Sequence, residues 1–486
     1  MRLACIQPRA FDLEQAEEGL AHALHMTEQA LPHRPDLILL PECTYPAYFL
    51  KGYRQVTLRP VAEVLEAFAR LARRGKCFIA LGLVEEVPDS PALRNSAVLL
   101  SVTGEVVARG HKHFLWHFDR RWFRPGSEPA LADTPWGKVG MFVCADGRLP
   151  EIPRLLALRG AGLQLDLTGW VSTGRDPARL TNPQAEYMLR TRALENHCYL
   201  AAANKVGMEA GRVVYCGRSQ IVSPTGTVLV EASPERPQVI WADLLLPHRP
   251  QLERHPAAYR LLARAPEELP VPPASPPGPY RLGAIQLEKG DSLPNFLDGL
   301  AYEGVAAAVS SPVEVASPPP RHLPLQVIGL RRGRETGALV QAPGFQREVW
   351  AHLSLEDRIL DTPTGRLGVM LGREGLQPEI ARVLALQGTD WIAWPCHLPS
   401  PILEPVSRTR AAENKVYLVA ANTPGPESGI SLVADPDGRI LAQAFPEPNQ
   451  AVAAQVHFVL ARDKTIVPGT DALGDRQPHL YAALTV

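Results

Sequence analysis

Short apolar runs alternate with helical patterns along the first half of the chain. Apolar runs bounded by turn residues predict buried strands, here DLILLPE (36–42), CFIALGLV (77–84), SAVLLS (96–101) and VGMFVCA (139–145). Apolar residues at helical spacing predict helices at about 13–30, 60–74, 150–160 and 183–197. Strands that are apolar on both faces and alternate with helices indicate sheets covered by helices, so we expect an α/β fold.

The second half of the sequence repeats the first. RLACIQ (2–7) returns as RLGAIQ (281–286), DTPWGKVGMFV (133–143) as DTPTGRLGVML (361–371), PEIPRLLALRG (150–160) as PEIARVLALQG (378–388), and LRTRALENHCYLAAAN (189–204) as SRTRAAENKVYLVAAN (407–422). Predicted hairpins at 222–230 and 433–441 turn at Gly226 and Gly438. We infer a tandem duplication with a first domain at 1–262, a proline-rich linker at 263–280 and a second domain at 281–486.

Composition excludes several classes of protein. The 486 residues contain 50 basic and 51 acidic side chains, which does not favour a nucleic-acid partner or an anionic membrane surface. We find no apolar run long enough to span a bilayer, and the N-terminal MRLACIQPRAFDLEQ becomes polar too early for a signal peptide. Seven scattered cysteines do not form a disulfide framework. We therefore expect a cytoplasmic protein with free thiols.

Three reactive side chains follow predicted strands in the first half. Cys144 ends an apolar strand shortly before Pro150, which suits the first turn of a helix. A cysteine nucleophile needs a base and a donor for the developing oxyanion, and Glu42 and Lys112 stand at other strand ends. The acid, the amine and the thiol could meet at one edge of a sheet.

The strings DLILLPE, GHKHFL and GMFVCADGRLPE resemble the glutamate, lysine and cysteine motifs of the nitrilase superfamily, the carbon–nitrogen hydrolases. The resemblance covers most of residues 1–260 and implies an α-β-β-α sandwich that needs no metal or cofactor. It implies that Glu42 is the general base, Lys112 the oxyanion stabiliser and Cys144 the nucleophile, acting through a thioester. CADGRLPE is closer to the amidase and carbamoylase forms of the motif than to the nitrilase form.

Three further residues are candidates for the site that this resemblance implies. The N–H of Ala145 would be a second oxyanion donor, and Asp119 stands where the family has a supporting glutamate. Tyr48 could line the pocket for the acyl group, although a packing aromatic is an equally good interpretation. We therefore expect a small-molecule, amide-type substrate.

The second half lacks all three catalytic side chains. Gly372 stands at the cysteine position, no lysine occurs between Lys289 and Lys415, and VAAAVSSP (305–312) has no carboxylate. We expect this half to be inert as a hydrolase. In the superfamily the best-matched helices pack against a second subunit, so we expect the halves to pair as an intramolecular pseudo-dimer.

Other interpretations remain open at this point. His111, His113 and His117 could be metal ligands, but no further ligand set is apparent, so we predict no metal site. Arg192, Glu195 and Asn196 repeat in the second half and therefore indicate a structural network. The alternatives to an amidase or N-carbamoyl amidohydrolase are a nitrile hydrolase with the same three residues, and a non-enzymatic binding or scaffold protein.

Overall fold

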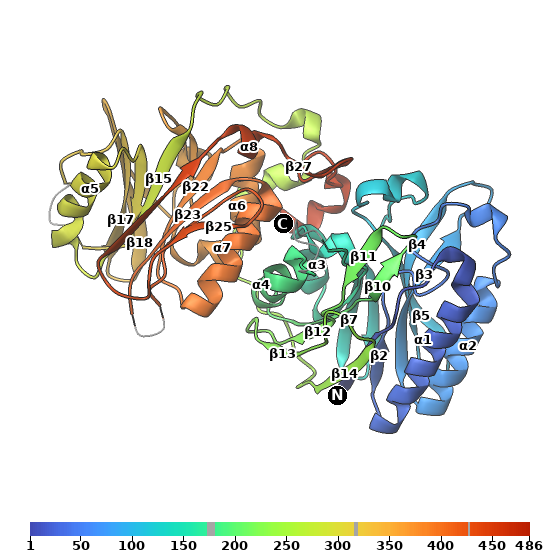
Figure 1. Ribbon diagram of the computed structural model, residues 1–486. Coiled ribbons are helices and arrows are strands. Elements are labelled where there is room, and N and C mark those ends of the chain that lie inside the picture. The colour runs from blue at the N-terminus through green and yellow to red at the C-terminus, as the bar shows by residue number, and fades with distance from the viewer. Residues whose placement is uncertain (173–179, 315–318, 426–427) are drawn as a thin grey trace. The chain divides into compact units, whose positions relative to one another are not determined.

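A computed structural model describes residues 1–172, 180–314, 319–425 and 428–486. The chain divides into two compact units, Met1–Leu252 and Glu253–Val486. Each unit contains two six-stranded sheets (Figure 1).

The sheets of the first unit combine a parallel centre with antiparallel edges. One has the order β14-β1-β2-β3-β4-β5, formed by Gln238–Asp243, Arg2–Gln7, Leu37–Leu39, Phe78–Glu86, Leu93–Leu100 and Val106–His111. The other has the order β13-β12-β9-β8-β7-β6, formed by Val228–Glu231, Gln220–Val222, Tyr199–Ala203, Ala161–Leu167, Gly137–Val143 and Ala130–Thr134. Strands β1, β2 and β3 run parallel, as do β7, β8 and β9. A separate hairpin joins β10 (Val206–Glu209) to β11 (Val213–Cys216).

Helices cover the outer faces of both sheets in this unit. Helices α1 (Ala16–Ala30) and α2 (Val61–Gly75) bury their apolar sides on the β1–β5 sheet, forming one core cluster with its strands (Figure 1). Helices α3 (Glu151–Leu158) and α4 (Leu189–Glu195) lie on the other sheet. Because the two sheets also contact each other, the unit is the α-β-β-α sandwich that the sequence predicted.

The second unit repeats this plan. One sheet has the order β19-β18-β17-β16-β15-β26, formed by Phe345–Trp350, Glu335–Ala342, Leu325–Arg332, Ala307–Ser310, Tyr280–Gln286 and Gln450–Val456. The other has the order β20-β21-β22-β23-β24-β25, formed by Ile359–Thr362, Gly365–Val369, Trp391–Cys396, Tyr417–Asn422, Leu432–Ala434 and Ile440–Gln443. Helix α7 (Ser400–Asn414) packs on the second sheet, and helix α6 (Pro378–Leu386) packs beside α7. The short helix α8 (Val459–Arg462) and the pair β27 (Thr465–Val467) and β28 (Thr470–Asp471) follow the last long strand.

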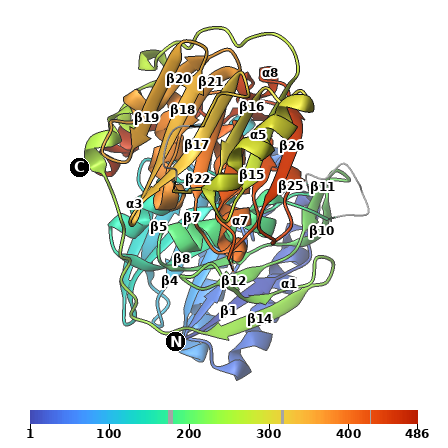
Figure 2. The ribbon, with the colours of Figure 1, turned by 90° about the vertical axis from the view of Figure 1, so that its left-hand side faces the viewer.

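One helix of the first unit has no counterpart among the described residues of the second. In the first unit residues 40–77 join β2 to β3 and contain α2, whereas residues 311–324 make the equivalent connection and hold no helix in their described part. Helix α5 (Leu293–Tyr302) alone covers the outer face of the β15–β17 sheet (Figure 2).

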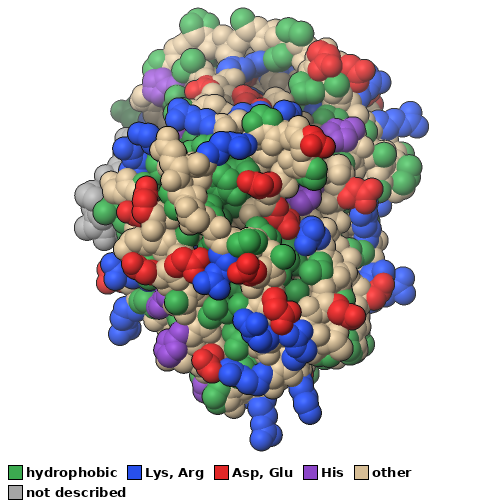
Figure 3. All heavy atoms as spheres, turned by 90° about the vertical axis from the view of Figure 1, so that its right-hand side faces the viewer, with side chains coloured by type: hydrophobic (Ala, Val, Ile, Leu, Met, Phe, Trp, Pro, Cys, Tyr) green, Lys and Arg blue, Asp and Glu red, His purple; other side chains and the backbone are tan. Residues whose placement is uncertain are grey.

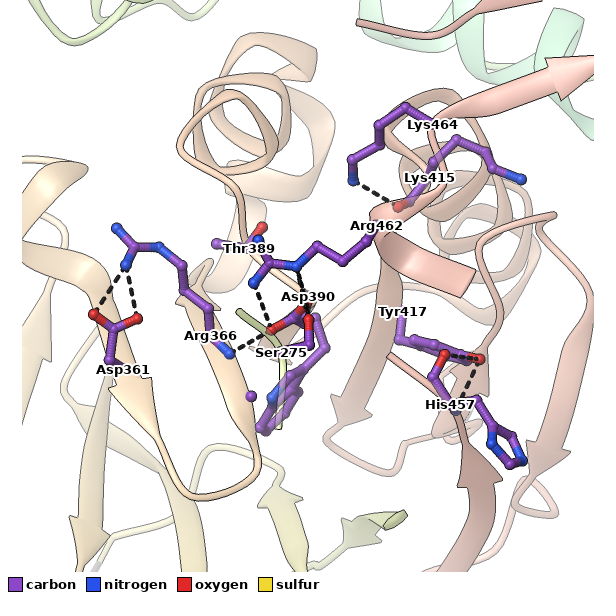
Figure 4. Close-up of polar contacts among 12 residues, drawn as sticks. Ser275, Asp361, Arg366, Thr389, Asp390, Lys415, Tyr417, His457, Arg462 and Lys464 are labelled. Carbon is purple, nitrogen blue, oxygen red and sulfur yellow. Dashed lines mark hydrogen bonds and ion pairs between the residues drawn. The ribbon is translucent and has the colours of Figure 1, made fainter. Parts of the chain in front are cut away.

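Residues 263–280, predicted to form a linker, pack as part of the second unit. The Ser275 hydroxyl donates a 2.7 Å hydrogen bond to the buried Asp390 carboxylate, which also binds the Arg462 guanidinium at 2.6 Å (Figure 4). Arg476 donates hydrogen bonds to the carbonyls of Leu262 and Arg264. These polar contacts hold a proline-rich segment whose composition predicted a semi-rigid linker between the domains. The division between the two compact units falls earlier, after Leu252.

The surface carries charges of both signs. In the face shown in Figure 3, Lys and Arg side chains are interspersed with Asp and Glu. Exposed ion pairs such as Arg74–Glu28, at 2.6 Å between α2 and α1, belong to this pattern. Among the described residues, no helix combines the length and apolar character needed to cross a membrane.

Candidate active site

The three residues singled out in the sequence follow strands of the two sheets. Glu42 lies shortly after β2, Lys112 directly after β5, and Cys144 directly after β7. The exposed fractions are 1% for Glu42, 0% for Lys112 and 8% for Cys144. The Lys112 ammonium lies 2.8 Å from Glu42 Oε1. The fold therefore brings together an acid and an amine that are far apart in the sequence.

Cys144 stands at the start of a tight turn, the 3₁₀ segment Cys144–Gly147. Its φ of +48° is a left-handed conformation that residues with a side chain rarely adopt. The backbone is held on both sides, because the Cys144 N–H donates to Asp166 Oδ1 at 2.9 Å and the Cys144 carbonyl accepts from Gln184 Nε2 at 2.8 Å. This turn presents the thiol at the carboxyl end of a parallel strand.

Electrostatics couple the thiol to the other two residues. Burial raises the pKa of the Cys144 thiol well above its usual value, and the Glu42 carboxylate raises it further. The Lys112 ammonium lowers that pKa. The resting thiol is therefore protonated, and its reaction as a nucleophile requires transfer of the proton to a base.

The Glu42 carboxylate is fixed by neighbours. Its Oε1 accepts hydrogen bonds from Asn95 Nδ2 at 2.6 Å and from Lys112 Nζ. Gly169 lies against the other oxygen, since a Cβ at that position would come within 2.6 Å of Glu42 Oε2. The missing side chain at position 169 leaves room for the carboxylate.

Lys112 lies between two buried carboxylates. Its second partner is Asp119 Oδ2, at 2.7 Å, on a side chain with no exposed surface. Burial alone would lower the pKa of Lys112, but the charges of Asp119 and Glu42 raise it well above its usual value. The shorter aspartate therefore reaches the lysine from the short helical segment His117–Arg121.

Tyr48 supports the same pair of charges. Its hydroxyl donates to Asp119 Oδ1 at 2.8 Å, its backbone N–H donates to Glu209 Oε1 at 2.8 Å, and its ring centre lies 5.5 Å from Lys112 Nζ. Tyr48 thus orients the lysine and its aspartate. Ala145 follows Cys144 in the turn and is buried. Contact of Tyr48 or Ala145 with a substrate stays a prediction.

Asp146 ties the nucleophile turn to the lysine segment, and the sequence analysis did not single it out. Its Oδ1 accepts the N–H groups of His113 at 2.9 Å and Phe114 at 2.7 Å, while its Oδ2 accepts the Val143 N–H at 3.2 Å. The only sequence signal is its place two residues after Cys144. The sequence analysis also did not single out Asn95, which donates a hydrogen bond to Glu42.

The histidine motif does not assemble as one cluster. His111 Nδ1 lies 2.9 Å from the Ser96 hydroxyl, whereas His113 Nδ1 lies 3.3 Å from Asp146 Oδ2. In the described part of the chain, no group of three His, Cys, Asp or Glu side chains is placed to hold a metal ion.

The repeated Arg–Glu pair supports the turn in both units. Arg192 forms an ion pair with Glu195 and donates to the Gly147 carbonyl at 2.9 Å. Arg410 forms the same ion pair with Glu413 and donates to the Gly375 carbonyl at 2.9 Å. The pair is therefore a structural network, as its repetition indicated.

The second unit keeps the turn without the reactive side chains. Gly372 has a φ of +50°, and its neighbour in space is Thr336, 3.3 Å from a Cβ built there. Because β19 ends at Trp350 as β5 ends at His111, Ala351 takes the place of Lys112. The second unit therefore keeps the turn but has glycine and alanine at the positions of Cys144 and Lys112.

Comparison with known proteins identifies the family of the chain. The model of the family "Carbon-nitrogen hydrolase" matches residues 2–249 and 310–463, one range in each unit. A Schizosaccharomyces pombe protein named as a probable nitrilase is 28% identical over 247 residues, covering 49% of this chain and 86% of the relative. Omega-amidase NIT2 of Bos taurus is 26% identical over 252 residues, covering 50% and 88%. A solved structure of an amidase from Nesterenkonia sp. AN1 is 28% identical, covers 50% of this chain and 93% of its own, and has a TM-score of 0.45. The two matched ranges confirm the resemblance and the duplication, and the chain belongs to the carbon–nitrogen hydrolase family.

Proposed function

We propose that the first unit hydrolyses the C–N bond of a small linear amide or N-carbamoyl compound through a thioester on Cys144. The observation that carries the proposal is the buried Lys112 ammonium, 2.8 Å from Glu42 and 2.7 Å from Asp119, which lowers the pKa of the thiol on the left-handed turn. A relative named omega-amidase supports an amide as the substrate class.

The acylation half of the reaction follows from this arrangement. The Glu42 carboxylate takes the thiol proton, and the Cys144 sulfur bonds to the amide carbon while the carbonyl electrons move to oxygen. The Lys112 ammonium and the Ala145 N–H stabilise the resulting oxyanion. The C–N bond then breaks, Glu42 returns its proton to the leaving nitrogen, and ammonia or an amine departs.

The deacylation half reuses the same base. Glu42 takes a proton from water, and the oxygen of that water bonds to the thioester carbon. The C–S bond breaks, the sulfur leaves with the proton held by Glu42, and a carboxylic acid is released. Because Lys112 is fixed from both sides, its ammonium is available at the oxyanion in both halves without rearrangement.

The alternatives explain the site less well. The same thiolate could attack a nitrile. The cysteine motif is of the amidase form, however, and the relative named omega-amidase indicates an amide rather than a nitrile as the substrate. A non-enzymatic binding protein does not account for the electrostatic coupling of Glu42, Lys112 and Cys144 in the first unit, because the second unit keeps the same sheet topology without these side chains.

The remaining predictions concern the whole chain. We propose that the second unit is catalytically inert, because Gly372 and Ala351 stand where Cys144 and Lys112 stand in the first. Pairing of the halves within the chain and a cytoplasmic location stay predictions from the sequence.

The proposal is tested by ammonia release from a panel of small amides and N-carbamoyl acids. We expect the wild-type chain to release ammonia from at least one member and Cys144→Ala to release none above background. Equal release by both proteins would contradict the assignment of the nucleophile.

A further inference from the structure

A row of polar side chains lies on one face of β8, a buried strand. Gln164, Asp166 and Thr168 occupy alternate positions of the segment that ends this strand, and alternate residues of a strand share a face. All three side chains have no exposed surface. Gln164 Oε1 and Asp166 Oδ2 accept no hydrogen bond among the described residues, whereas the Thr168 side chain is hydrogen-bonded to the Cys144 thiol and lowers its pKa. Unpaired buried oxygens are unfavourable for folding.

The second unit shows that the fold does not require this row. Leu163 of β8 is paired with Tyr199, and Trp391 of β22 is paired with Tyr417 in the repeated motif, so the two strands can be aligned residue by residue. The positions of the polar row are occupied in the second unit by Ile392, Trp394 and Cys396, all fully buried. The unit without catalytic residues therefore has an apolar row, and the unit with them has a polar one.

The central member of each row contacts the turn differently. In the first unit Asp166 Oδ1 accepts the N–H of Cys144 at 2.9 Å. In the second unit Trp394 Nε1 donates instead to the carbonyl of Gly372 at 2.8 Å. Glycine adopts a positive φ without strain, whereas cysteine does not. The turn that carries a side chain is thus the one whose N–H is fixed by a carboxyl group.

We propose that Asp166 is a positioning residue that holds the Cys144 N–H and so keeps the nucleophile in its left-handed conformation. The inference rests on the proposed function of the first unit. It assigns a purpose to a buried carboxyl group that contacts neither Glu42 nor Lys112 by a hydrogen bond among the described residues. The acceptor oxygen, rather than a negative charge, is what the role requires.

The electrostatic surroundings agree with a neutral carboxyl group. Burial raises the pKa of Asp166 well above its usual value, the hydrogen bond from Cys144 lowers it, and the charges of Glu42 and Asp146 raise it further, while Lys112 lowers it. An ionised Asp166 would raise the pKa of the Cys144 thiol. A protonated Asp166 keeps its acceptor oxygen without opposing formation of the thiolate.

The test compares Asp166→Asn, which keeps an acceptor oxygen, with Asp166→Leu, which does not. Gln164→Ile is the matched control, because it introduces the residue of the second unit at a row position that does not contact the turn. Using the full chain and an amide hydrolysed by the wild type, we expect Asp166→Asn and Gln164→Ile to keep kcat within about threefold. Asp166→Leu should lower kcat about 100-fold with little change in KM, since a misplaced nucleophile impairs chemistry more than binding.

Alkylation of Cys144 by iodoacetamide, followed by peptide mass spectrometry across pH, gives a second readout that needs no substrate. The apparent thiol pKa of Asp166→Asn should equal or lie below that of the wild type. A higher value would overturn the proposal even if Asp166→Leu does not fold, and so would equal kcat losses in Asn and Leu variants or wild-type kcat in a folded Asp166→Leu. Wild-type hydrolysis that does not depend on Cys144 would instead refute the proposed function.

Discussion

Cys144 and Gly372 occupy the same left-handed turn in their two units, with φ of +48° and +50°. In each unit an arginine, paired with a glutamate, supports the turn by donating a hydrogen bond to the carbonyl of Gly147 or Gly375. This glycine is the third residue after Cys144 or Gly372. The left-handed turn is therefore common to both units, and in the first unit the proposed contact from Asp166 holds it where a cysteine stands in place of the glycine. The side chains around the turn differ, because the first unit has Glu42, Lys112 and Cys144 and the second has glycine and alanine at the cysteine and lysine positions.

Transplanting the thiol alone should not create a second active site. We expect the double variant Cys144→Ala/Gly372→Cys to release no more ammonia than Cys144→Ala, because Ala351 and the carboxylate-free segment before Pro312 supply neither amine nor base. A Cβ at 372 would lie 3.3 Å from Thr336 Oγ1, a close contact with a side-chain atom that can shift, and the positive φ adds backbone strain of the kind that Cys144 already has. The variant should therefore fold with reduced stability. Ammonia release restored toward the wild-type rate would refute the proposal that the second unit is catalytically inert.

Removal of the amine should damage both activity and stability. Lys112→Met leaves the carboxylates of Glu42 and Asp119 buried without their shared cation, a change that costs about 3–5 kcal/mol in the free energy of unfolding. Loss of one oxyanion donor should lower kcat by a factor of about 10² or more. Denaturant unfolding and steady-state kinetics measure the two effects, and an active, equally stable variant would contradict the role of Lys112.

A single methyl group beside Glu42 should disturb the base. The Cβ in Gly169→Ala would lie 2.6 Å from Glu42 Oε2, so the carboxylate has to move and kcat should fall about tenfold or more. Gly299→Ala, in helix α5, is the control, because a Cβ there meets nothing within 4 Å. We expect Gly299→Ala to keep wild-type kinetics. Equal kinetics for the two variants would contradict the expectation that a Cβ at position 169 displaces the Glu42 carboxylate.

Lys464 should make stability depend on pH. Burial and the nearby cations Arg462, Lys415 and Arg382 lower its pKa to about 7, although Asp390 opposes this. Its ammonium donates to the carbonyls of Asn414 and Lys415 at the end of α7, and Figure 4 shows the bond to Lys415. In the unfolded chain the lysine has a pKa of about 10.4, so the unfolded chain binds the proton more tightly than the folded chain does. The penalty is therefore fully present below pH 7 and is relieved as pH rises toward 10.

Comparison with Lys464→Met isolates this effect. The free energy of unfolding of the wild type should rise relative to that of Lys464→Met between pH 7 and 10. The lost hydrogen bonds add an offset that does not depend on pH. Parallel curves for the two proteins over this range would show that Lys464 keeps an ordinary pKa.

Local signals in the sequence predicted the elements and the repeat. Apolar runs predicted the strands but not their bounds, since the run at 36–42 contains only the short strand β2 and the run at 139–145 extends beyond β7. The turn at Gly226, with a φ of +76°, was predicted from glycine between apolar segments. Glu42, Lys112 and Cys144 could be predicted because each follows a strand inside a recognisable motif. These features depend on residues that are neighbours in the chain.

Features that depend on contacts between distant segments were missed. Asp166 lies in LQLDLTGW, which reads as a buried strand, and only its partner across the fold, the Cys144 N–H, gives it a purpose. Ser275 lies in a proline-rich stretch whose docking on Asp390 no local pattern indicates. The absence of a helix from the described part of 311–324 could not be predicted from the sequence repeat, because none of the repeated motifs lies in this segment.

The central claim is that the reaction passes through a thioester on Cys144. An amide that the wild type hydrolyses should be mixed with the full chain, quenched with acid during turnover, and digested for mass spectrometry. We predict that the peptide containing Cys144 gains the mass of the acyl group and loses it on treatment with hydroxylamine. Continued turnover with an unmodified Cys144 peptide, or with the acyl group on another residue, would contradict the account.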